Sequence, residues 1–360
     1  MKHILLVVPR MNIGGAESYV ATLALALQQK GFRVSVASGG GMLAEQLKQA
    51  GISQHFLPLR LSTGLSAWML AKIIRKEQVD LVHANSAAAG IAAVKTKQRY
   101  LPDLPVIYTA HGVFGHNEKE RLLDHCDQIL CVSDFVRRDA AAKGYCREKL
   151  RTLYNGIDTE RFVPGCQERA SLREKMGIPE DAFVLAIVSR IKNLHDKGHG
   201  DLLEILSSDV RAKNWHLLVI GKGKALSSVQ AVAKAKQMTD RVHCLGHVLD
   251  VENYLDAADL MVLPSKFETF GLVLGEAMAM GKPAIAYRAG GTAEVIADGI
   301  SGYLAAPQNR QELADKICLL AENPKLCQKM GIAAREWVTE KFPYDKMMKE
   351  LLLVYKQLLP

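Results

Sequence analysis

The stretch SKFETFGLVLGEAMAMGKP, from Ser265 to Pro283, carries the most information in this chain of 360 residues. The apolar run Leu260–Leu263 precedes it and predicts a buried parallel strand, whereas Leu272–Met280 predicts a helix. Glu268 then lies in the strand-to-helix loop and Glu276 in the first turns of the helix. Because open α/β sheets bind ligands at the carboxyl ends of their strands, both carboxylates are predicted at a ligand-binding edge.

The backbone at the start of this helix offers a second kind of ligand partner. The N–H groups of Phe270, Gly271 and Leu272 have no partner within the helix and can donate to ligand oxygens. A sugar or a ribose needs carboxylate acceptors for its hydroxyl groups, and Glu268 and Glu276 supply them. The loop therefore predicts a binding site for a polyol such as a sugar or a ribose.

The same segment resembles the Glu-x7-Glu signature of the retaining GT-B glycosyltransferases, in particular glycosyltransferase family 4 (group 1). The match continues through Gly281–Ala286 and Gly290–Ile296. An ordinary strand-loop-helix unit with surface glutamates would explain the segment alone, but three further motifs agree with the family. The resemblance covers nearly the whole chain, is strongest over residues 184–304 and is weakest over residues 41–82.

Strand-like apolar runs alternate with amphipathic helical runs along the whole chain. This pattern predicts parallel sheets of βαβ units with helices on both faces, and the length favours two domains over one. The predicted strands are Ile4–Val8, Arg33–Ala37, Leu81–His83, Val106–Tyr108, Gln128–Val132, Val184–Val188, Trp215–Ile220, Val242–Leu245, Leu260–Leu263 and Ala284–Tyr287.

The resemblance implies the GT-B fold, an α/β architecture of two Rossmann-like domains whose parallel sheets face each other across a cleft. The expected boundary lies in the turn-rich segment Asn155–Pro164. It separates an acceptor-side domain, residues 1–162, from a nucleotide-sugar-binding domain, residues 163–343. The last helix, residues 344–360, is amphipathic and packs back on the N-terminal domain in relatives of this architecture.

A glycine motif, Asn12-Ile13-Gly14-Gly15-Ala16-Glu17, joins the first predicted strand to a helix. Glycines let the backbone approach a diphosphate, and the helix start offers N–H donors and a favourable dipole. The motif differs from the Gly-x-Gly-x-x-Gly fingerprint of dinucleotide binding, and a turn that only connects strand to helix is the plainer alternative. In the family, the loop that matches Gly14 and Gly15 lies against the donor diphosphate.

Two cations follow a predicted strand in the second half of the chain. Arg190 lies at the end of this strand, and Lys197 with Gly198 ends the loop that follows. Lys192–His195 make this loop irregular. Arginine can bind phosphate oxygens with two parallel hydrogen bonds, and lysine acts as a point charge. Because charge grows on a leaving diphosphate, such cations stabilise the transition state. A solvated basic loop is the alternative; in the family the matching residues hold the diphosphate.

His111 also ends a predicted strand. A lone histidine is more often structural, and the chain contains eleven. The resemblance nevertheless places His111 near the donor sugar, where it would position or hydrogen-bond the sugar and not remove a proton. His83 is expected to be structural.

Several chemistries lack their residues in this sequence. No Asp-x-Asp occurs, so metal-bridged handling of a diphosphate has no ligand set, and neither a metal nor a cofactor is expected beside the co-substrate. Gly-x-Ser-x-Gly and Walker A motifs are also absent, and Gly221–Lys224 lacks the P-loop spacing. Seven cysteines form no Cys-x-x-Cys pair, and the N-terminal apolar run is too short for the hydrophobic region of a signal peptide with its cleavage site. Together these features predict a cytoplasmic protein with reduced thiols.

Positive charge is concentrated in the first half of the chain. Residues 1–161 hold 21 Lys and Arg against 14 Asp and Glu, a net charge of +7 within a total of +8. This excess predicts that the first half faces an anionic surface or acceptor. Trp68 and its apolar neighbours precede Arg75 and Lys76. This pattern is typical of a helix that lies on a lipid headgroup layer. It is equally typical of a helix that packs its apolar face on the core and presents its basic face to solvent. Nucleic acid is a weaker interpretation because no binding motif occurs. The other basic positions are Arg60, Lys72, Lys95, Lys97, Arg99, Arg137 and Arg138.

The resemblance implies a retaining, metal-independent hexosyltransferase that uses a nucleoside diphosphate sugar, with UDP favoured over GDP. The acceptor would be a glycan or a lipid-linked glycan in cell-surface polysaccharide or lipopolysaccharide biosynthesis, at the inner face of the plasma membrane. Three alternatives are a GT-B nucleotide-sugar epimerase, a transferase that acts on a small soluble acceptor, and an inactive protein that binds sugar nucleotides.

Site roles also follow from the resemblance. Glu276 would accept the ribose hydroxyls and Glu268 the sugar hydroxyls near the anomeric carbon. No carboxylate is found for a double displacement, so attack on the same face is the expected route to retention. The catalytic candidates are Glu268, His111, Arg190 and Lys197, and the donor-binding candidates are Gly14, Gly15, Arg190, Lys197, Glu268, Phe270, Gly271, Leu272 and Glu276.

Overall fold

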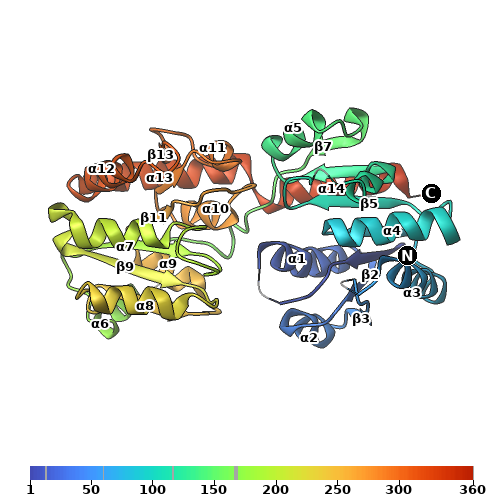
Figure 1. Ribbon diagram of the computed structural model, residues 1–360, viewed down its shortest axis with the longest axis horizontal. Helices are drawn as coiled ribbons and strands as arrows, with labels where there is room; N and C mark the ends of the chain where they lie inside the picture. The colour runs from blue at the N-terminus through green and yellow to red at the C-terminus, as the bar shows by residue number, and fades with distance from the viewer. Residues whose placement is uncertain (13, 60, 116, 166–168, 360) are drawn as a thin grey trace. The chain divides into compact units, whose positions relative to one another are not determined.

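The structure is a computed structural model that describes residues 1–12, 14–59, 61–115, 117–165 and 169–359 (Figure 1). Ile13 and Arg60, which the sequence analysis names, lie outside these residues, and so does Cys166, one of the seven cysteines. The chain divides into two compact units: Met1–Asn155 with Met348–Pro360 forms the N-terminal unit, and Gly156–Met347 forms the C-terminal unit. Each is a parallel sheet accompanied by helices, so the predicted pair of Rossmann-like α/β domains is confirmed.

The N-terminal unit contains a seven-stranded sheet in the order β3-β2-β1-β4-β5-β6-β7. Its inner strands β1, β4 and β5 are buried along their whole length, as both faces of a parallel sheet must be when helices cover them. The strands are β1 (His3–Val7), β2 (Arg33–Ser38), β3 (Ser53–Phe56), β4 (Leu81–Ala84), β5 (Val106–Ala110), β6 (Gln128–Cys131) and β7 (Leu150–Thr152). The helices are α1 (Gly15–Gln29), α2 (Met42–Gln49), α3 (Thr63–Glu77), α4 (Ala87–Tyr100) and α5 (Asp134–Ala142), with short 3-10 helices η1 (Glu120–His125) and η2 (Arg147–Lys149).

The C-terminal unit contains a six-stranded sheet in the order β10-β9-β8-β11-β12-β13. The strands are β8 (Phe183–Val188), β9 (Trp215–Ile220), β10 (Val242–Gly246), β11 (Leu260–Leu263), β12 (Ala284–Tyr287) and β13 (Gly302–Ala305). The helices are α6 (Arg169–Lys175), α7 (His199–Ser208), η3 (Val210–Asn214), α8 (Leu226–Ala235), α9 (Val251–Ala257), α10 (Leu272–Ala279), α11 (Thr292–Val295), α12 (Arg310–Ala321) and α13 (Pro324–Lys341). Within the ranges that the structure describes, no helix of either unit is long and apolar enough to cross a membrane.

The last helix, α14 (Tyr344–Leu358), is tied to the sheet of the N-terminal unit through a buried histidine. Tyr355 Oη lies 2.7 Å from His83 Nδ1, and His83 Nε2 lies 2.6 Å from Thr109 Oγ1. All three side chains are buried, and burial lowers the pKa of His83 to about 3. His83 is therefore a neutral core residue with both ring nitrogens satisfied, which agrees with its predicted structural role.

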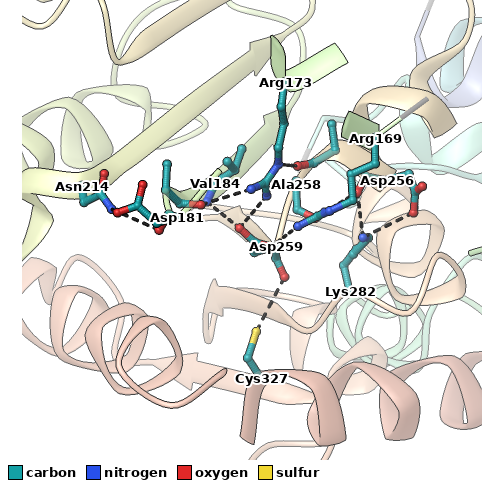
Figure 2. Close-up of polar contacts among 12 residues, drawn as sticks. Arg169, Arg173, Asp181, Val184, Asn214, Asp256, Ala258, Asp259, Lys282 and Cys327 are labelled. Atoms are coloured by element: carbon teal, nitrogen blue, oxygen red, sulfur yellow. Dashed lines mark hydrogen bonds and ion pairs between the residues drawn. The ribbon is translucent and has the colours of Figure 1, made fainter. Parts of the chain in front are cut away.

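A charge network holds the amino edge of the C-terminal sheet (Figure 2). Asp259, directly before β11, accepts hydrogen bonds from Arg169 Nη2 at 2.5 Å and from Arg173 Nη2 at 2.8 Å. Its Oδ2 also accepts from the backbone N–H of Val184 at 2.8 Å. The two guanidinium groups donate further to backbone carbonyls at the end of α9 and of the residue that follows it. This network fixes α6 against the start of the sheet.

Lys282 and Cys327 border this network (Figure 2). Lys282 Nζ donates to the backbone oxygen of Asp256 at 2.8 Å and lies 3.4 Å from its carboxylate, and burial lowers the pKa of this lysine. The Cys327 thiol lies 3.8 Å from the carbonyl oxygen of Asp259, and burial raises its pKa to about 11. The thiol therefore stays protonated at neutral pH. The described cysteines are all free.

Candidate active site

Four loops that carry motifs from the sequence analysis lie at the carboxyl edge of the C-terminal sheet. Arg190 follows β8, Gly221 follows β9, Glu268 follows β11 and Gly290 follows β12. These strands are parallel, and β9, β8, β11 and β12 are consecutive neighbours in the sheet. The loops that leave them therefore share one edge, as the sequence predicts for Arg190, Lys197, Glu268 and Glu276.

Lys197 and Glu268 are in direct contact at this edge. Lys197 Nζ lies 2.5 Å from Glu268 Oε1, and the hydroxyl of Ser265 donates to the same oxygen at 2.8 Å. The Glu268 side chain is 13% exposed and that of Lys197 is 30% exposed, so water reaches the pair. A charge-assisted hydrogen bond of this kind can be exchanged for one to a phosphate oxygen.

Backbone contacts hold the two loops of this ion pair together. The N–H of Lys266 donates to the carbonyl oxygen of Asp196 at 3.0 Å. Gly198, directly after Lys197, has a φ of +77°, and a Cβ there would collide with the carbonyl oxygen of Pro264. Gly198 is thus required for this close approach, which places Lys197 beside Glu268.

The loop after β12 supports Glu268 from the other side. Glu268 forms a parallel bridge with Gly290, and the N–H of Gly291 donates to the carbonyl oxygen of Glu268 at 2.8 Å. A Cβ on Gly290 or Gly291 would collide with the backbone oxygen of Glu268 or Thr269, respectively. Gly290 and Gly291 begin the segment Gly290–Ile296, which also resembles the family. Their structural role is to allow this loop to pack against the backbone that carries Glu268.

The start of α10 presents backbone donors to the same edge. Gly271 is the N-cap, with a φ of +91°, and no side chain caps the helix, so its first N–H groups are available to a ligand. Phe270 is buried and packs edge-on against Phe342, with ring centroids 5.3 Å apart. Phe270 and Gly271 therefore shape the turn, while the backbone of Gly271 and Leu272 provides donors.

Glu276, in the second turn of α10, has an environment unlike that of Glu268. Within the part of the chain that the structure describes, no residue forms a hydrogen bond with the Glu276 carboxylate. Burial raises its pKa to about 7, the positive charge of Arg161 opposes this rise, and the negative charge of Glu252 adds to it. Near neutral pH this carboxyl group therefore exchanges its proton readily, and a ligand hydroxyl that donates to it would favour the ionised form.

Arg161 and Glu252 were missed by the sequence analysis as site residues. Arg161 Nη2 lies 2.8 Å from Glu252 Oε2 and donates to the carbonyl oxygen of Leu249 at 3.1 Å. This pair joins the segment before α6 to the start of α9 and sets part of the field at Glu276. The only signal for Arg161 was its place in the turn-rich segment Asn155–Pro164, and Glu252 gave none.

Arg190 is exposed on a loop that pairs with the turn after β9. The N–H of Ile191 donates to the carbonyl oxygen of Lys222 at 3.2 Å. A Cβ on Gly221, whose φ is +132°, would collide with the carbonyl oxygen of Ser189, and one on Gly223 with that of Ile191. These glycines allow the two loops to pack, which explains the Gly221–Lys224 motif without a phosphate-binding role.

The glycine motif of the N-terminal unit begins α1. Gly14 is the N-cap and Gly15 the first helical residue, and no side chain of the described residues caps this helix. Gly14 has an extended φ of 174°, which any residue can adopt. The neighbouring loop is fixed by hydrogen bonds from Met11 N–H to Gly40 O at 2.9 Å and from Leu43 N–H to Met11 O at 2.8 Å. The loop thus exposes helix-start donors, although Ile13 lies outside the described residues.

His111 follows β5 in the same unit. Its ring meets that of Tyr19 of α1 edge-on, with centroids 4.8 Å apart, and Nε2 lies 3.4 Å from Asn85 Oδ1. Burial lowers the pKa of His111 to about 4, so the imidazole is neutral at pH 7. A neutral imidazole can donate one hydrogen bond and accept another.

Comparison with known proteins agrees with these features. The model for "Glycosyltransferase Family 4" matches residues 13–161, and the model for "Glycosyl transferases group 1" matches residues 168–337. The chain is 29% identical to the N-acetyl-alpha-D-glucosaminyl L-malate synthase of Bacillus anthracis over 81% of this chain and 78% of that protein. It is 26% identical to the D-inositol 3-phosphate glycosyltransferase of Saccharomonospora viridis over 96% and 90% of the two chains. Anabaena Alr3699/HepE, solved with UDP and glucose, matches with a TM-score of 0.88 over 99% of this chain and 100% of that one, at 21% identity.

Proposed function

Because this chain belongs to the group 1 glycosyltransferases of family 4 and has their GT-B fold, we propose that it transfers a hexosyl group from UDP-sugar to a glycan or lipid-linked glycan acceptor. The anomeric configuration is retained. The observation that carries the proposal is the contact of Lys197 with Glu268 at the carboxyl edge of the C-terminal sheet. There, the backbone of the adjoining loops holds a cation and a carboxylate beside the donor groups of a helix start.

The donor would rearrange this ion pair. Its diphosphate takes Lys197 and Arg190 as partners, together with the N–H groups at the start of α10, and Glu268 is released to accept sugar hydroxyls. Glu276 accepts the ribose hydroxyls. The complex of HepE with UDP and glucose supports UDP as the nucleotide.

The acceptor attacks from the face that the diphosphate leaves, and a diphosphate oxygen takes the acceptor proton. Arg190 and Lys197 stabilise the charge that grows on the leaving group, so the proposed reaction proceeds without a metal ion. The backbone of Gly14 and Gly15 assists at the diphosphate, and His111 hydrogen-bonds the sugar.

A thermal-shift panel of UDP- and GDP-sugars tests the donor assignment. A ligand at 100 times its Kd adds about 2.7 kcal/mol to the free energy of unfolding, so UDP-sugars are expected to raise Tm and GDP-sugars to raise it less. The shift and the transfer activity should both persist in EDTA. Activity lost with the chelator would contradict the metal-free mechanism, and a product of inverted anomeric configuration, read by NMR, would contradict retention.

A surface on α3 and β3 supports a lipid-linked acceptor. Phe56 is 67% exposed, Leu61 80% and Trp68 44%, and a groove of about 350 Å³ runs between β3 and α3. Lys72 Nζ lies 3.7 Å from the centre of the Trp68 ring. The groove is lined by Gln54, His55, Phe56, Trp68, Met69, Lys72 and Ile73.

The charge of this surface is complementary to anionic headgroups. Within the described part of the chain, Lys72, Arg75 and Lys76 are paired with no carboxylate, whereas Lys97 is paired with Asp127 at 2.6 Å. The C-terminal end of α3 thus keeps its positive charge beside exposed apolar side chains, the combination that binds membrane interfaces. We therefore assign the acceptor to the membrane surface, in polysaccharide or lipopolysaccharide synthesis on the cytoplasmic face.

Sedimentation with vesicles tests this assignment. The protein should bind vesicles that contain phosphatidylglycerol more tightly than phosphatidylcholine vesicles, and salt should weaken the binding as the screening length falls to about 10 Å at 0.1 M. Replacing Lys72, Arg75 and Lys76 by Gln should reduce vesicle binding and leave the affinity for UDP-glucose unchanged. Replacement of Lys213, Lys234 and Lys236 in the C-terminal unit is the matched control. A parent protein that ignores both vesicles would contradict the membrane assignment.

A small soluble acceptor is the second candidate, and the names of two relatives favour it. They denote transfer to L-malate and to D-inositol 3-phosphate, both of which are small anions. An anionic acceptor would also suit the net charge of +7 over residues 1–161. Assays with malate and inositol phosphate, beside the vesicle experiment, separate this candidate from the lipid-linked one.

A further inference from the structure

A hydrogen bond joins the first turn of α7 to the end of β12. Tyr287, the last residue of β12, is buried, and its hydroxyl donates to Asp201 Oδ2 at 2.9 Å. Asp201 belongs to the first turn of α7, and its Oδ1 lies 3.3 Å from Nε of Arg310, the first residue of α12. Asp201 therefore joins α7, β12 and α12 at the carboxyl edge of the C-terminal sheet, beside the candidate active site.

Burial and charge keep the proton of this hydrogen bond on Tyr287. Burial raises the pKa of the Tyr287 hydroxyl, and the negative charge of Asp201 raises it further. At neutral pH the hydroxyl is therefore the donor and the carboxylate is the acceptor. A hydrogen bond to an ionised acceptor is stronger than one between neutral groups. Because Tyr287 is only 1% exposed, water competes little for its hydroxyl.

The same turn of α7 is also tied to the strands β8 and β11. His199, the first residue of α7, is buried, and its Nε2 lies 3.2 Å from the hydroxyl of Ser189, which follows β8. Burial lowers the pKa of His199 to about 4, and the positive charge of Lys197 adds to this effect, so the ring is neutral at pH 7. Gly198 packs on Pro264, which follows β11. Since β8, β11 and β12 are consecutive in the sheet, the start of α7 is fixed to the ends of three neighbouring strands.

Lys197 directly precedes this fixed turn. The N–H of Leu202 donates to the carbonyl oxygen of Gly198 at 3.1 Å, so the backbone beside Lys197 is bonded to the turn that carries Asp201. In the proposed reaction, the ammonium group of Lys197 leaves Glu268 for the diphosphate. The ion pair then no longer holds Lys197, and its position depends on the start of α7.

We propose that Asp201 and Tyr287 are positioning residues for Lys197. Their hydrogen bond keeps the start of α7 on β12, so that the ammonium group stays in place when it exchanges Glu268 for the diphosphate. The inference rests on the proposed function in that the new partner of Lys197 is the donor diphosphate. Because negative charge grows on the diphosphate as its bond to the sugar breaks, a displaced Lys197 destabilises the transition state more than the bound donor. Loss of the hydrogen bond should therefore lower kcat more than it raises KM.

A double-mutant cycle in the intact enzyme tests this role. Tyr287→Phe removes one hydroxyl and should lower kcat about tenfold, with KM for UDP-glucose changed by less than about twofold. In the Lys197→Ala background, the same substitution should cause no further loss of kcat, because the ammonium group that it displaces is absent. A general structural defect would instead lower kcat by the same factor in both backgrounds.

Asp209→Ala is the matched control for Asp201→Ala. Asp209 follows α7 at its other end and pairs with Arg211 at 2.6 Å. Its replacement removes an Arg–Asp pair from the same helix and leaves the start of that helix unchanged. Asp201→Ala should lower kcat at least as much as Tyr287→Phe does, whereas Asp209→Ala should retain the kcat of the parent.

Hydrogen exchange measured by mass spectrometry tests the contact in the absence of a donor. Peptides that cover residues 196–203 should exchange faster in Tyr287→Phe and Asp201→Ala, and at the parent rate in Asp209→Ala. Unchanged exchange in Tyr287→Phe, or an equal loss of kcat in both backgrounds of the cycle, would overturn the inference. Faster exchange in a protein without transferase activity would uphold the role of the hydrogen bond in holding this loop and reject the proposed function. If Asp201→Ala does not fold, Tyr287→Phe decides alone.

Discussion

At the amino edge of the C-terminal sheet, the carboxylate of Asp259 accepts from two guanidinium groups and one backbone N–H. At the carboxyl edge, the carboxylate of Glu268 has one lysine and one hydroxyl on the same oxygen. Both edges are rich in charge, so charge alone does not identify a site. The difference lies in how far the charges are satisfied by the protein, because a less saturated group can exchange its partner for a ligand.

The largest expected effect is on stability and comes from the amino edge. Asp259→Ala leaves Arg173, whose side chain is 9% exposed, without its carboxylate, and loss of one partner of such a pair costs about 3–5 kcal/mol. Urea unfolding should show this loss in the transition of the C-terminal unit. KM for the donor, measured below the unfolding temperature, should stay near that of the parent. A loss below about 1 kcal/mol would show that the Asp259 network contributes less to the free energy of unfolding than the number of its hydrogen bonds indicates.

The next effect is on turnover and comes from the carboxyl edge. Lys197→Ala should lower kcat by about 10²–10³, the loss expected when one preorganised donor to a developing negative charge is removed. Stability should change little, because the ion pair is partly exposed. Lys192→Ala, an exposed lysine of the same loop, is the control and should retain kcat. A rise in KM with unchanged kcat would mean that Lys197 only binds the donor.

The sequence predicted the buried inner strands better than some of the strands at the edges of the two sheets. The bounds of β9, β11 and β12 were predicted without error, because these strands are buried along their whole length and are apolar except for His216 of β9. The strands that the sequence analysis did not name are β3, β7 and β13, and each is an edge strand. β3 reads SQHF and β7 reads LRT, so neither has an apolar run. An edge strand pairs on one side only, and its side chains need not be buried.

Prediction of the candidate site had a similar limit. Parallel topology alone brings Arg190, Lys197 and Glu268 to one edge, so their common location followed from the order of strands and loops. The contact of Lys197 with Glu268, 71 residues apart, depends on the fit of Gly198 against Pro264, which no periodicity reveals. The sequence therefore shows which charged residues are present, whereas the packing of the loops determines which of these residues are in contact.

A third effect distinguishes the two carboxylates of the carboxyl edge. Glu276→Gln should weaken binding of UDP-glucose by about 1.5–3 kcal/mol, because a charged acceptor for the ribose is lost. In the parent, affinity should rise with pH through about 7, as Glu276 ionises, and this rise should be absent in the variant. Calorimetric titration between pH 6 and 8 measures both. Equal affinities at every pH would remove Glu276 from the site.

The stability of the parent has the opposite dependence on pH from its donor affinity. The pKa of Glu276 is raised in the folded state, to about 7, above the value of about 4.3 in the unfolded chain. The unfolded state therefore binds fewer protons between these values, and the free energy of unfolding of the parent falls as pH rises through this window. Glu276→Gln should be the more stable protein at pH 8, and the difference should vanish near pH 4. A difference in Tm that does not change with pH would show that burial of Glu276 costs little.

The smallest effect should come from Arg161, whose pair with Glu252 is exposed enough to contribute about 0.5 kcal/mol or less to stability. Arg161→Gln removes the positive charge that opposes the raised pKa of Glu276 and leaves Glu252 to raise it further, so the pH at which donor affinity rises should move upward. Glu252→Gln should move it downward, and the double variant should lie between the two. Calorimetric titration of UDP-glucose against pH measures the three midpoints, with little change in Tm. Identical midpoints would mean that Glu276 is controlled by burial alone, and that the pair only joins α9 to the segment before α6.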